Sequence, residues 1–442
     1  MSDNPHQPPS RSSSNSSDLS ESSTVIGPKR RQAAVIFIFI TVLLDVLSLS
    51  VTIPVLPQLI KKFAGGSFEL GSQYHGWFVT VWAMMQFICS PIMGALSDRF
   101  GRRPVILLSC LGLGLDYILM ALAPDLKWLF IGRVISGITA ASFSTAGAYI
   151  ADVTPPEKRA SSYGMLGAAF GLGFVIGPAM GGVLGEYDLR LPFWVAAFLT
   201  ILNAVYGAFI LPESLSKENR TAFSWKRANP LGSLKLLRSH PELLGLAGIM
   251  LLYQLSHQVF QTVFVFYTDY RYAWTEKTTG LTLMVVGLMS VLMQGGVVRR
   301  TAPKLGERRM LIIALAFGAA GYFIYAIAPN GWIFWLGIPV FSLVGYFSAA
   351  IQGLMTRRVS ANEQGQLQGA NSSIMGIAGM IGPWIFANIF SFAIHEEASV
   401  KIPGLPFMFA AVLHIVALIV AFIIVKPTPV SQESQEAPKA AT

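Results

Sequence analysis

Three charged residues lie deep inside long apolar segments: Asp45 in TVLLDVLSLSVTIPVLP, Asp116 in GLGLDYILM and Arg133 in LFIGRVISGITAA. If these segments span a membrane, such charges are costly, and they pair with one another or serve a function. A low-dielectric cavity favours the protonated form of a carboxyl group, whereas a nearby guanidinium favours the carboxylate. A movement that separates Asp45 from Arg133 would therefore make the carboxyl group bind a proton, without covalent catalysis.

The spacing of these residues predicts their depth. Asp116 and Arg133 flank the Pro124-Asp125 turn nearly symmetrically, so each lies roughly 12 Å below the surface at a rise of 1.5 Å per residue. Asp45 comes about a dozen residues after its helix begins, near the middle of a hydrocarbon core roughly 30 Å thick. A purely structural ion pair is the alternative to a functional role for Asp116 and Arg133.

The amino-acid composition indicates that these apolar segments lie in a membrane. Hydrophobic residues make up 53% of the 442 residues and charged residues only 12%, against roughly 25% in soluble domains. We therefore predict an all-α, polytopic membrane protein and exclude a soluble enzyme. The net charge of +9 comes from basic residues in short loops, which indicates membrane topology and no nucleic-acid partner. Cys89 and Cys110 lie in apolar runs, so we expect buried thiols without a disulfide or metal.

The chain divides into twelve segments that satisfy the length of about 20 residues that a spanning helix needs. The predicted spans are residues 33–59, 76–97, 104–123, 127–150, 161–185, 191–211, 243–268, 277–298, 309–328, 331–355, 366–394 and 404–425. Polar tails at 1–32 and 426–442 are expected to be disordered. Lys and Arg divide as 24 on the side of the termini and 7 on the opposite side, with Arg133 within a span. This asymmetry predicts that both termini and both tails are cytoplasmic.

An internal repeat relates the two halves of the chain. At an offset of 205 residues Gly101 matches Gly306, Gly164 matches Gly369, and Gly177-Pro178 matches Gly382-Pro383. We therefore predict two six-helix halves, 33–211 and 243–425, joined by a cytoplasmic linker at 212–242. Two such halves with a site between them are the architecture of a secondary transporter.

The loop GALSDRFGRR resembles the cytoplasmic loop signature of the major facilitator superfamily. The longer stretch QFICSPIMGALSDRFGRRPVILLSCLGLGLDYILMALAP is similar to the tetracycline and multidrug branch of its twelve-span proton antiporters. The resemblance implies a conformational latch in this loop, formed by Gly94, Asp98, Arg99, Gly101, Arg102 and Arg103. We expect the two glycines to permit close approach of neighbouring backbone, and Pro303 takes the place of Asp98 in the second half.

Two helix motifs extend the resemblance. The segment AAFGLGFVIGPAMGGVLGE resembles the antiporter signature, and it predicts a kinked, closely packed helix through Gly173, Gly177, Pro178, Gly181 and Gly182. The segment LFIGRVISGITAA resembles the signature whose arginine is associated with proton coupling, and this implies that role for Arg133.

Several polar and aromatic residues could line a substrate cavity between the halves, namely Gln86, Tyr253, Gln254, Gln258, Gln261, Phe264, Gln294 and Gln352. Each glutamine could equally form hydrogen bonds between helices. His257 is expected to be a polar packing residue rather than a proton carrier.

The sequence also departs from the tetracycline exporters. The resemblance implies an aspartate in the ninth span, where Gly318 stands, and a histidine in the eighth, where Ser290 stands. Because no acidic residue lies at membrane depth in the second half, proton coupling is expected to depend on the first half, and tetracycline is the less favoured substrate.

The favoured function is proton-coupled export of a small amphiphilic drug or metabolite across the bacterial inner membrane. A nutrient importer or facilitator of the same fold and a non-transporting membrane receptor are the alternatives. The expected partners are the substrate, protons and the lipid bilayer, and no cofactor motif is found.

Overall fold

The computed structural model describes residues 28–140, 142–155, 158–225, 229–230, 232–360, 363–398 and 400–425, and it contains helices and no strand in these ranges. The first predicted tail lies outside the described residues up to residue 27, and the second lies wholly outside them. The first helix begins at Pro28, earlier than the predicted boundary at residue 33.

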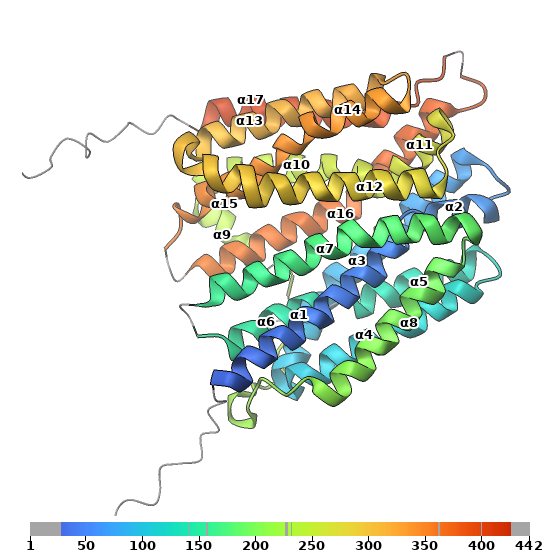
Figure 1. Ribbon diagram of the computed structural model, residues 1–442. Helices are drawn as coiled ribbons and strands as arrows, with labels where there is room; N and C mark the ends of the chain where they lie inside the picture. The colour runs from blue at the N-terminus through green and yellow to red at the C-terminus, as the bar shows by residue number, and fades with distance from the viewer. Residues whose placement is uncertain are drawn as a thin grey trace, which may run out of the picture.

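The first half is built of helices that cross the bundle in alternating directions (Figure 1). They are α1 (Pro28–Val51), α2 (Leu56–Phe63), α3 (Phe68–Phe100), α4 (Arg102–Leu122), α5 (Leu126–Thr139), α6 (Ser142–Val153), α7 (Arg159–Tyr187) and α8 (Leu191–Ile210). The turn before α5 is set by Asp125, whose carboxylate caps this helix by accepting hydrogen bonds from the Lys127 and Trp128 amides.

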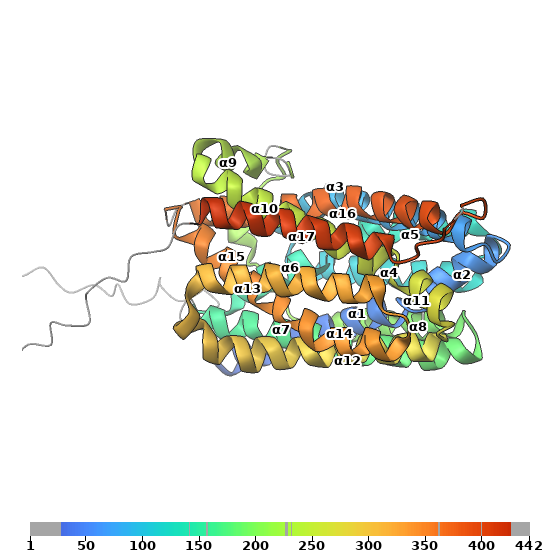
Figure 2. The ribbon, with the colours of Figure 1, turned by 90° about the horizontal axis from the view of Figure 1, so that it is seen from above.

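The predicted linker contains structure of its own, two 3-10 turns at Lys217–Asn219 and Gly232–Leu234 followed by α9 (Lys235–Ser239), which stands outside the bundle beside α10 (Figure 2). The second half follows with α10 (Pro241–Thr262), α11 (Phe264–Tyr272), α12 (Glu276–Val291), the π-helix η4 (Leu292–Val298), α13 (Arg299–Ile327), α14 (Gly331–Ser342), η5 (Leu343–Gly345), α15 (Tyr346–Thr356), α16 (Gln364–Ile394) and α17 (Leu405–Ile424).

Ten helical segments of the described chain are long and apolar enough to cross a membrane. One of them, Glu276–Ile327, has 52 residues and would be about 78 Å long as one straight helix, far more than a bilayer core. It contains a break at Gly306, where φ is +71°. The helices α5 and α6 are each too short to be counted alone. The helical membrane fold is therefore confirmed, while the number of twelve passes stays a prediction.

The structure repeats with the predicted offset of 205 residues. Gly101 and Gly306 both have a positive φ, +107° and +71°, a conformation that favours glycine. An ion pair is also repeated with its charges exchanged. The Arg102 Nε lies 3.1 Å from Asp152 Oδ2, and at the equivalent positions Arg357 lies 2.8 Å from Glu307.

The two halves meet where α7 packs on α12 and α3 packs on α16 (Figures 1 and 2). The same close contact occurs in both places. A Cβ atom added at Gly280 of α12 would lie 2.2 Å from the Pro178 carbonyl oxygen, and one added at Gly76 of α3 would lie 3.0 Å from the Pro383 carbonyl oxygen. Because Pro178 and Pro383 are repeat equivalents, the interface between the halves has approximate twofold symmetry.

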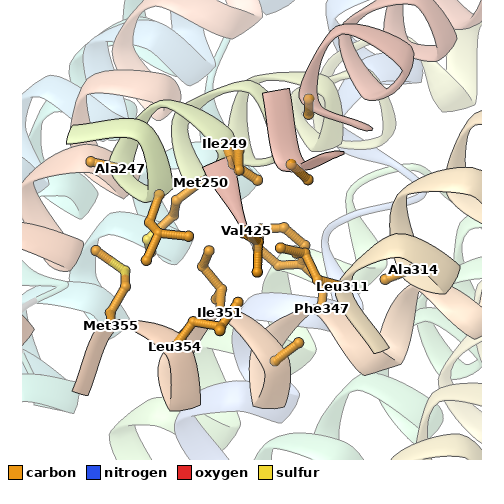
Figure 3. Packing of buried hydrophobic residues seen from close by; sticks show 14 of the residues in the cluster. Ala247, Ile249, Met250, Leu311, Ala314, Phe347, Ile351, Leu354, Met355 and Val425 are labelled. Carbon is orange, nitrogen blue, oxygen red and sulfur yellow. The ribbon is translucent and has the colours of Figure 1, made fainter. Parts of the chain in front are cut away.

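The start of α1 and the end of α17 lie at the same end of the bundle, on the left in Figure 1. We call this end the terminal end and the opposite one the distal end. In the second half, the helices near the terminal end are held by a buried apolar cluster that includes Met250, Leu311, Phe347 and Ile351 (Figure 3). This packing fixes α10, α13 and α15 relative to one another.

Candidate functional site

Asp45 lies on α1 with only 5% of its surface exposed. The Asn203 amide Nδ2 donates to its Oδ1 over 2.8 Å and to the Thr41 carbonyl over 2.9 Å, so Asn203 joins α8 to α1 at this point. The Cys110 thiol of α4 lies 3.6 Å from the same carboxylate oxygen. Cys110 is buried, as expected, and it contacts the carboxylate, whereas Cys89 is only partly buried.

Asp116 and Arg133 face each other across α4 and α5, with Oδ2 and an Nη atom 4.0 Å apart. The two side chains are almost fully buried, at 0% and 8% exposure. Room for the carboxylate comes from Gly132, where a Cβ atom would lie 2.7 Å from Asp116 Oδ1. The two residues that flank the Pro124-Asp125 turn therefore lie opposite each other and form an ion pair.

A cavity of about 20 Å³ lies beside Asp45, enough space for one water molecule. Side chains of five helices line it, including Trp82, Tyr117, Ser136 and Thr200. The Trp82 Nε1 and the Thr200 Oγ1 are buried and have no hydrogen-bond partner in the described part of the chain. Because buried polar atoms are almost always satisfied, a water molecule in this cavity would be held by these groups beside the carboxylate.

The loop at the terminal end of α3 forms a network of charges inside the first half. Arg102 binds Asp98 four residues earlier, at 2.5 Å, and it also binds Asp152 on α6. Its guanidinium also donates to Ser97 Oγ over 2.6 Å. Arg102 therefore holds α3, α4 and α6 together. The expected role of Asp98 in a latch stays a prediction.

Glu213, at the start of the linker, binds the beginning of α4. Its carboxylate accepts from the Arg102 amide over 2.9 Å and from the Arg103 amide over 3.3 Å, where the helix dipole favours a negative charge. A Cβ atom at Gly101 would lie 2.3 Å from this carboxylate. A side chain, and not the expected backbone, therefore makes the close approach at Gly101. The same expectation for Gly94 was wrong, because no atom lies within 4 Å of a Cβ added there.

The remaining arginines of the loop lie at its edge. The Arg103 guanidinium donates to the Ala208 carbonyl of α8, and Arg99 is exposed and lies over the Phe100 ring at 5.0 Å. These contacts tie Arg103 to its own half, whereas Arg99 is free to face solvent or lipid headgroups.

The glycines of α7 form two separate faces. Gly173, Gly177 and Gly181 lie against α1, and a Cβ atom at Gly181 would lie 1.9 Å from the Val51 carbonyl oxygen. Gly182 faces the other way, toward the Glu276 carbonyl of α12 at 2.4 Å. The predicted close packing is therefore present. Gly173, Gly177 and Gly181 pack within the first half, whereas Pro178 and Gly182 pack against the second half.

The distal end contains contacts between the halves that the sequence did not predict. Asp269 of α11 accepts from Gln58 Nε2 over 3.0 Å and forms an ion pair with Lys61, and both donors lie on α2. Further contacts join His75 to the Thr262 carbonyl, Gln73 to Ser391 and Glu69 to His395. We call the Gln58, Lys61 and Asp269 cluster the distal gate. The sequence signal for the distal gate is Asp269 itself, an acidic residue among the aromatic residues of FYTDYRY.

The expected cavity residues fall into different environments. Gln86, Gln254 and Gln258 are partly buried, while Gln261 and Gln294 are exposed. Gln352 accepts a hydrogen bond from Asn371 over 3.3 Å, which is the interhelical role weighed for it. Phe264 was wrongly expected in a cavity. It is 2% exposed and packs on the rings of Phe260 and Phe334, because α10 ends directly before it and α11 turns it into the core.

Comparisons with known proteins agree with this architecture. The family model of the Major Facilitator Superfamily matches residues 38–383. The chain is 37% identical over 388 residues to the tetracycline resistance protein, class C, of Escherichia coli, covering 87% of this chain and 95% of that protein. It is 30% identical over 379 residues to multidrug resistance protein 2 of Bacillus subtilis, covering 84% and 90%. The crystal structure of the human organic anion transporter MFSD10 (TETRAN) superposes with a TM-score of 0.67 at 24% identity, covering 89% and 100%.

Proposed function

Because this chain belongs to the major facilitator superfamily, and is a multi-pass membrane transporter rather than an enzyme, we propose that it exports small amphiphilic drugs in exchange for protons across the bacterial inner membrane. Support comes from relatives that are tetracycline and multidrug resistance proteins. The distribution of Lys and Arg supports cytoplasmic termini, so the terminal end faces the cytoplasm and the distal end faces outward.

The observation that carries the proton coupling is the environment of Asp45. Its carboxylate is buried beside a small cavity and accepts a hydrogen bond from the Asn203 amide, while the Asp116–Arg133 ion pair lies on the neighbouring helices. A carboxylate in such a place changes its proton affinity when the cavity opens to water or when the guanidinium moves. Arg133 and Asp116 then set the field at Asp45, and Asp45 carries the proton.

The described contacts between side chains of the two halves lie mainly at the distal end, as expected for a state closed to the outside. In this state the loop residues Asp98 and Arg102 are bound within their own half. We propose that the latch engages the second half only after the terminal end closes. The glutamines Gln86, Gln254 and Gln258 on α3 and α10 remain the candidates for substrate contact.

The experiment is transport by the full-length protein in proteoliposomes, with Asp45→Asn compared with Asp125→Asn. Asn203 can still bind an amide oxygen at position 45, so the variant is expected to fold and to bind substrate while losing uphill export driven by a proton gradient. The control removes an exposed carboxylate whose capping role an asparagine retains.

Substrate-dependent proton release from the wild-type protein would separate an exporter from a facilitator or receptor. Proton-driven uphill export by Asp45→Asn would contradict the coupling mechanism. Tetracycline and a hydrophobic cation, tested in parallel, identify the substrate class. Strong tetracycline export by the wild type would show that Gly318 and Ser290 do not exclude that drug.

A further inference from the structure

Two histidines lie side by side in the apolar interior of the second half. His257 of α10 and His414 of α17 have ring centroids 6.1 Å apart, and both rings contact Tyr253 and Tyr322. His414 is fully buried, at 0% exposure, whereas His257 is only partly buried. His257 is therefore the more accessible of the two imidazoles.

The hydrogen bonds of Ser256 favour one tautomer of His414. The Ser256 hydroxyl donates its single hydrogen to the Tyr253 carbonyl over 2.7 Å, so its oxygen is an acceptor for His414 Nδ1 at 3.0 Å. A neutral His414 then carries its hydrogen on Nδ1 and a lone pair on Nε2. This Nε2 is buried and has no hydrogen-bond partner among the described residues. Its lone pair is therefore the position at which this imidazole would accept a proton.

Gly318 of α13 makes room for this ring. A Cβ atom added at Gly318 would lie 2.8 Å from His414 Nε2 and 2.5 Å from Cδ2. The imidazole thus occupies the place of a side chain at position 318. Any residue other than glycine there would have to displace it or bind to it.

The cluster also has a place in its half similar to that of the Asp45 pocket, and the three matches that show this have offsets of 211, 205 and 214 residues. Asp45 lies six residues before the last residue of α1, and Ser256 lies six residues before the last residue of α10. Each of these helices is followed by a short helix, α2 or α11. Tyr117, which lines the Asp45 cavity, matches Tyr322 at the offset of 205 residues.

A third match gives the residue of the first half that corresponds to His414. The segment LPFWVAAFLT (191–200) of α8 aligns with LPFMFAAVLH (405–414) of α17, so His414 is the equivalent of Thr200. Thr200 lines the cavity beside Asp45. The first half therefore has a carboxylate in this pocket, and the second half has an imidazole in the corresponding one.

The surroundings contain no other group that titrates near neutral pH. The sequence has no Asp, Glu, Lys, Arg or Cys in residues 243–268, 278–298, 310–356, 364–394 or 405–425, which make up the apolar lengths of the helices of this half. The phenols of Tyr253 and Tyr322 face the pair from α10 and α13, and the α14 to α15 segment contributes Phe341 and Phe347. The charge state of the cluster therefore depends on the two imidazoles.

We propose that His414 is a second proton-binding site, which His257 connects to the space between the halves. Like the Asp45 site, it takes up a proton on the lone pair of a buried group, here Nε2, and releases it when the second half changes shape. This inference rests on the proposed proton exchange, and it adds a carrier to the half that has no membrane carboxylate.

The first test is direct and needs no transport. Histidine labelled with ¹⁵N in the full-length protein, in lipid nanodiscs, is titrated between about pH 5 and 8, where an imidazole can change its charge. The His414 resonance is assigned by its loss in His414→Thr, which installs the residue of the first half. We expect this resonance to titrate and its midpoint to move when substrate is added. A His414 that stays neutral throughout, with and without substrate, would refute the proposal.

The second test uses transport and a swap of the group. His414→Thr should flatten the pH dependence of export, and Gly318→Asp combined with His414→Thr should restore a pH dependence with a different midpoint, because a carboxylate then fills the vacated space. The control is His240→Gln on the linker. If Asp45→Asn abolishes coupling and His414→Thr leaves the pH profile unchanged, the second site is wrong and the proposed function stands. If the wild type shows no proton dependence, the proposed function fails, and the titration still decides the site.

Discussion

Asp269→Asn should shift the protein toward a state open at the distal end. The carboxylate of Asp269 joins the halves through Gln58 and Lys61, and the side chains of the ion pair are only 18% and 20% exposed. An asparagine keeps an acceptor oxygen for Gln58, so the substitution removes mainly the attraction to Lys61. Exposed ion pairs stabilise a protein by about 0.2–1 kcal/mol, and hydrogen bonds to charged groups by about 1.5–3 kcal/mol. For this partly buried pair we take a contribution of about 1 kcal/mol to the free energy of the closed state.

This free energy corresponds to about a fivefold increase in the ratio of distal-open to distal-closed molecules. The measurement is the distance distribution between spin labels at Lys62→Cys and Glu397→Cys, two exposed positions on opposite halves, with Cys89 replaced by serine. The matched control is Glu69→Gln, whose ion pair with His395 is more exposed and should have a smaller effect. A distribution that does not change in Asp269→Asn, or changes equally in both variants, would refute the assignment of the distal gate.

Two further predictions concern packing and orientation. Gly181→Ala should lower the free energy of unfolding by about 2 kcal/mol, because its Cβ would lie 1.9 Å from a backbone oxygen. Gly164→Ala on the same helix meets no atom within 4 Å and should be neutral or slightly stabilising. Thermal unfolding in detergent compares the two variants, and equal stability would contradict the close packing. A cysteine at exposed Arg99 should react with an impermeant maleimide only in inverted vesicles, and one at exposed Lys127 only in intact cells. The reverse pattern would overturn the orientation.

The sequence predicted those features that depend on local spacing. Asp116 and Arg133 flank a short turn, so any antiparallel pair of helices brings them together. The glycine spacing of α7 likewise requires close packing on one face, but it does not say which helices meet it. The repeat predicted equivalent positions, and Gly101 and Gly306 share their unusual backbone conformation for this reason.

Contacts between distant segments could not be predicted in this way. Asn203 is a single amide in an apolar helix, and nothing in its neighbourhood says that Asp45 lies opposite. In the sequence Glu213 is a linker residue, and only the fold shows that it binds the start of α4. Phe264 was misplaced because the break between α10 and α11 changes the helix face that it occupies. Each case depends on how helices far apart in the chain are packed.

Asp45, the α10 neighbours of His414 in the proposed second site, and the distal gate lie on one pair of chain segments. Asp45 lies on α1, which continues after a break into α2, and α2 carries Gln58 and Lys61. Ser256 and His257 lie on α10, which continues into α11, and α11 carries Asp269. A change of charge at either site therefore acts on a helix whose continuation holds the gate. Protonation and opening to the outside can be coupled through these two broken helices alone, because the gate joins them at the distal end.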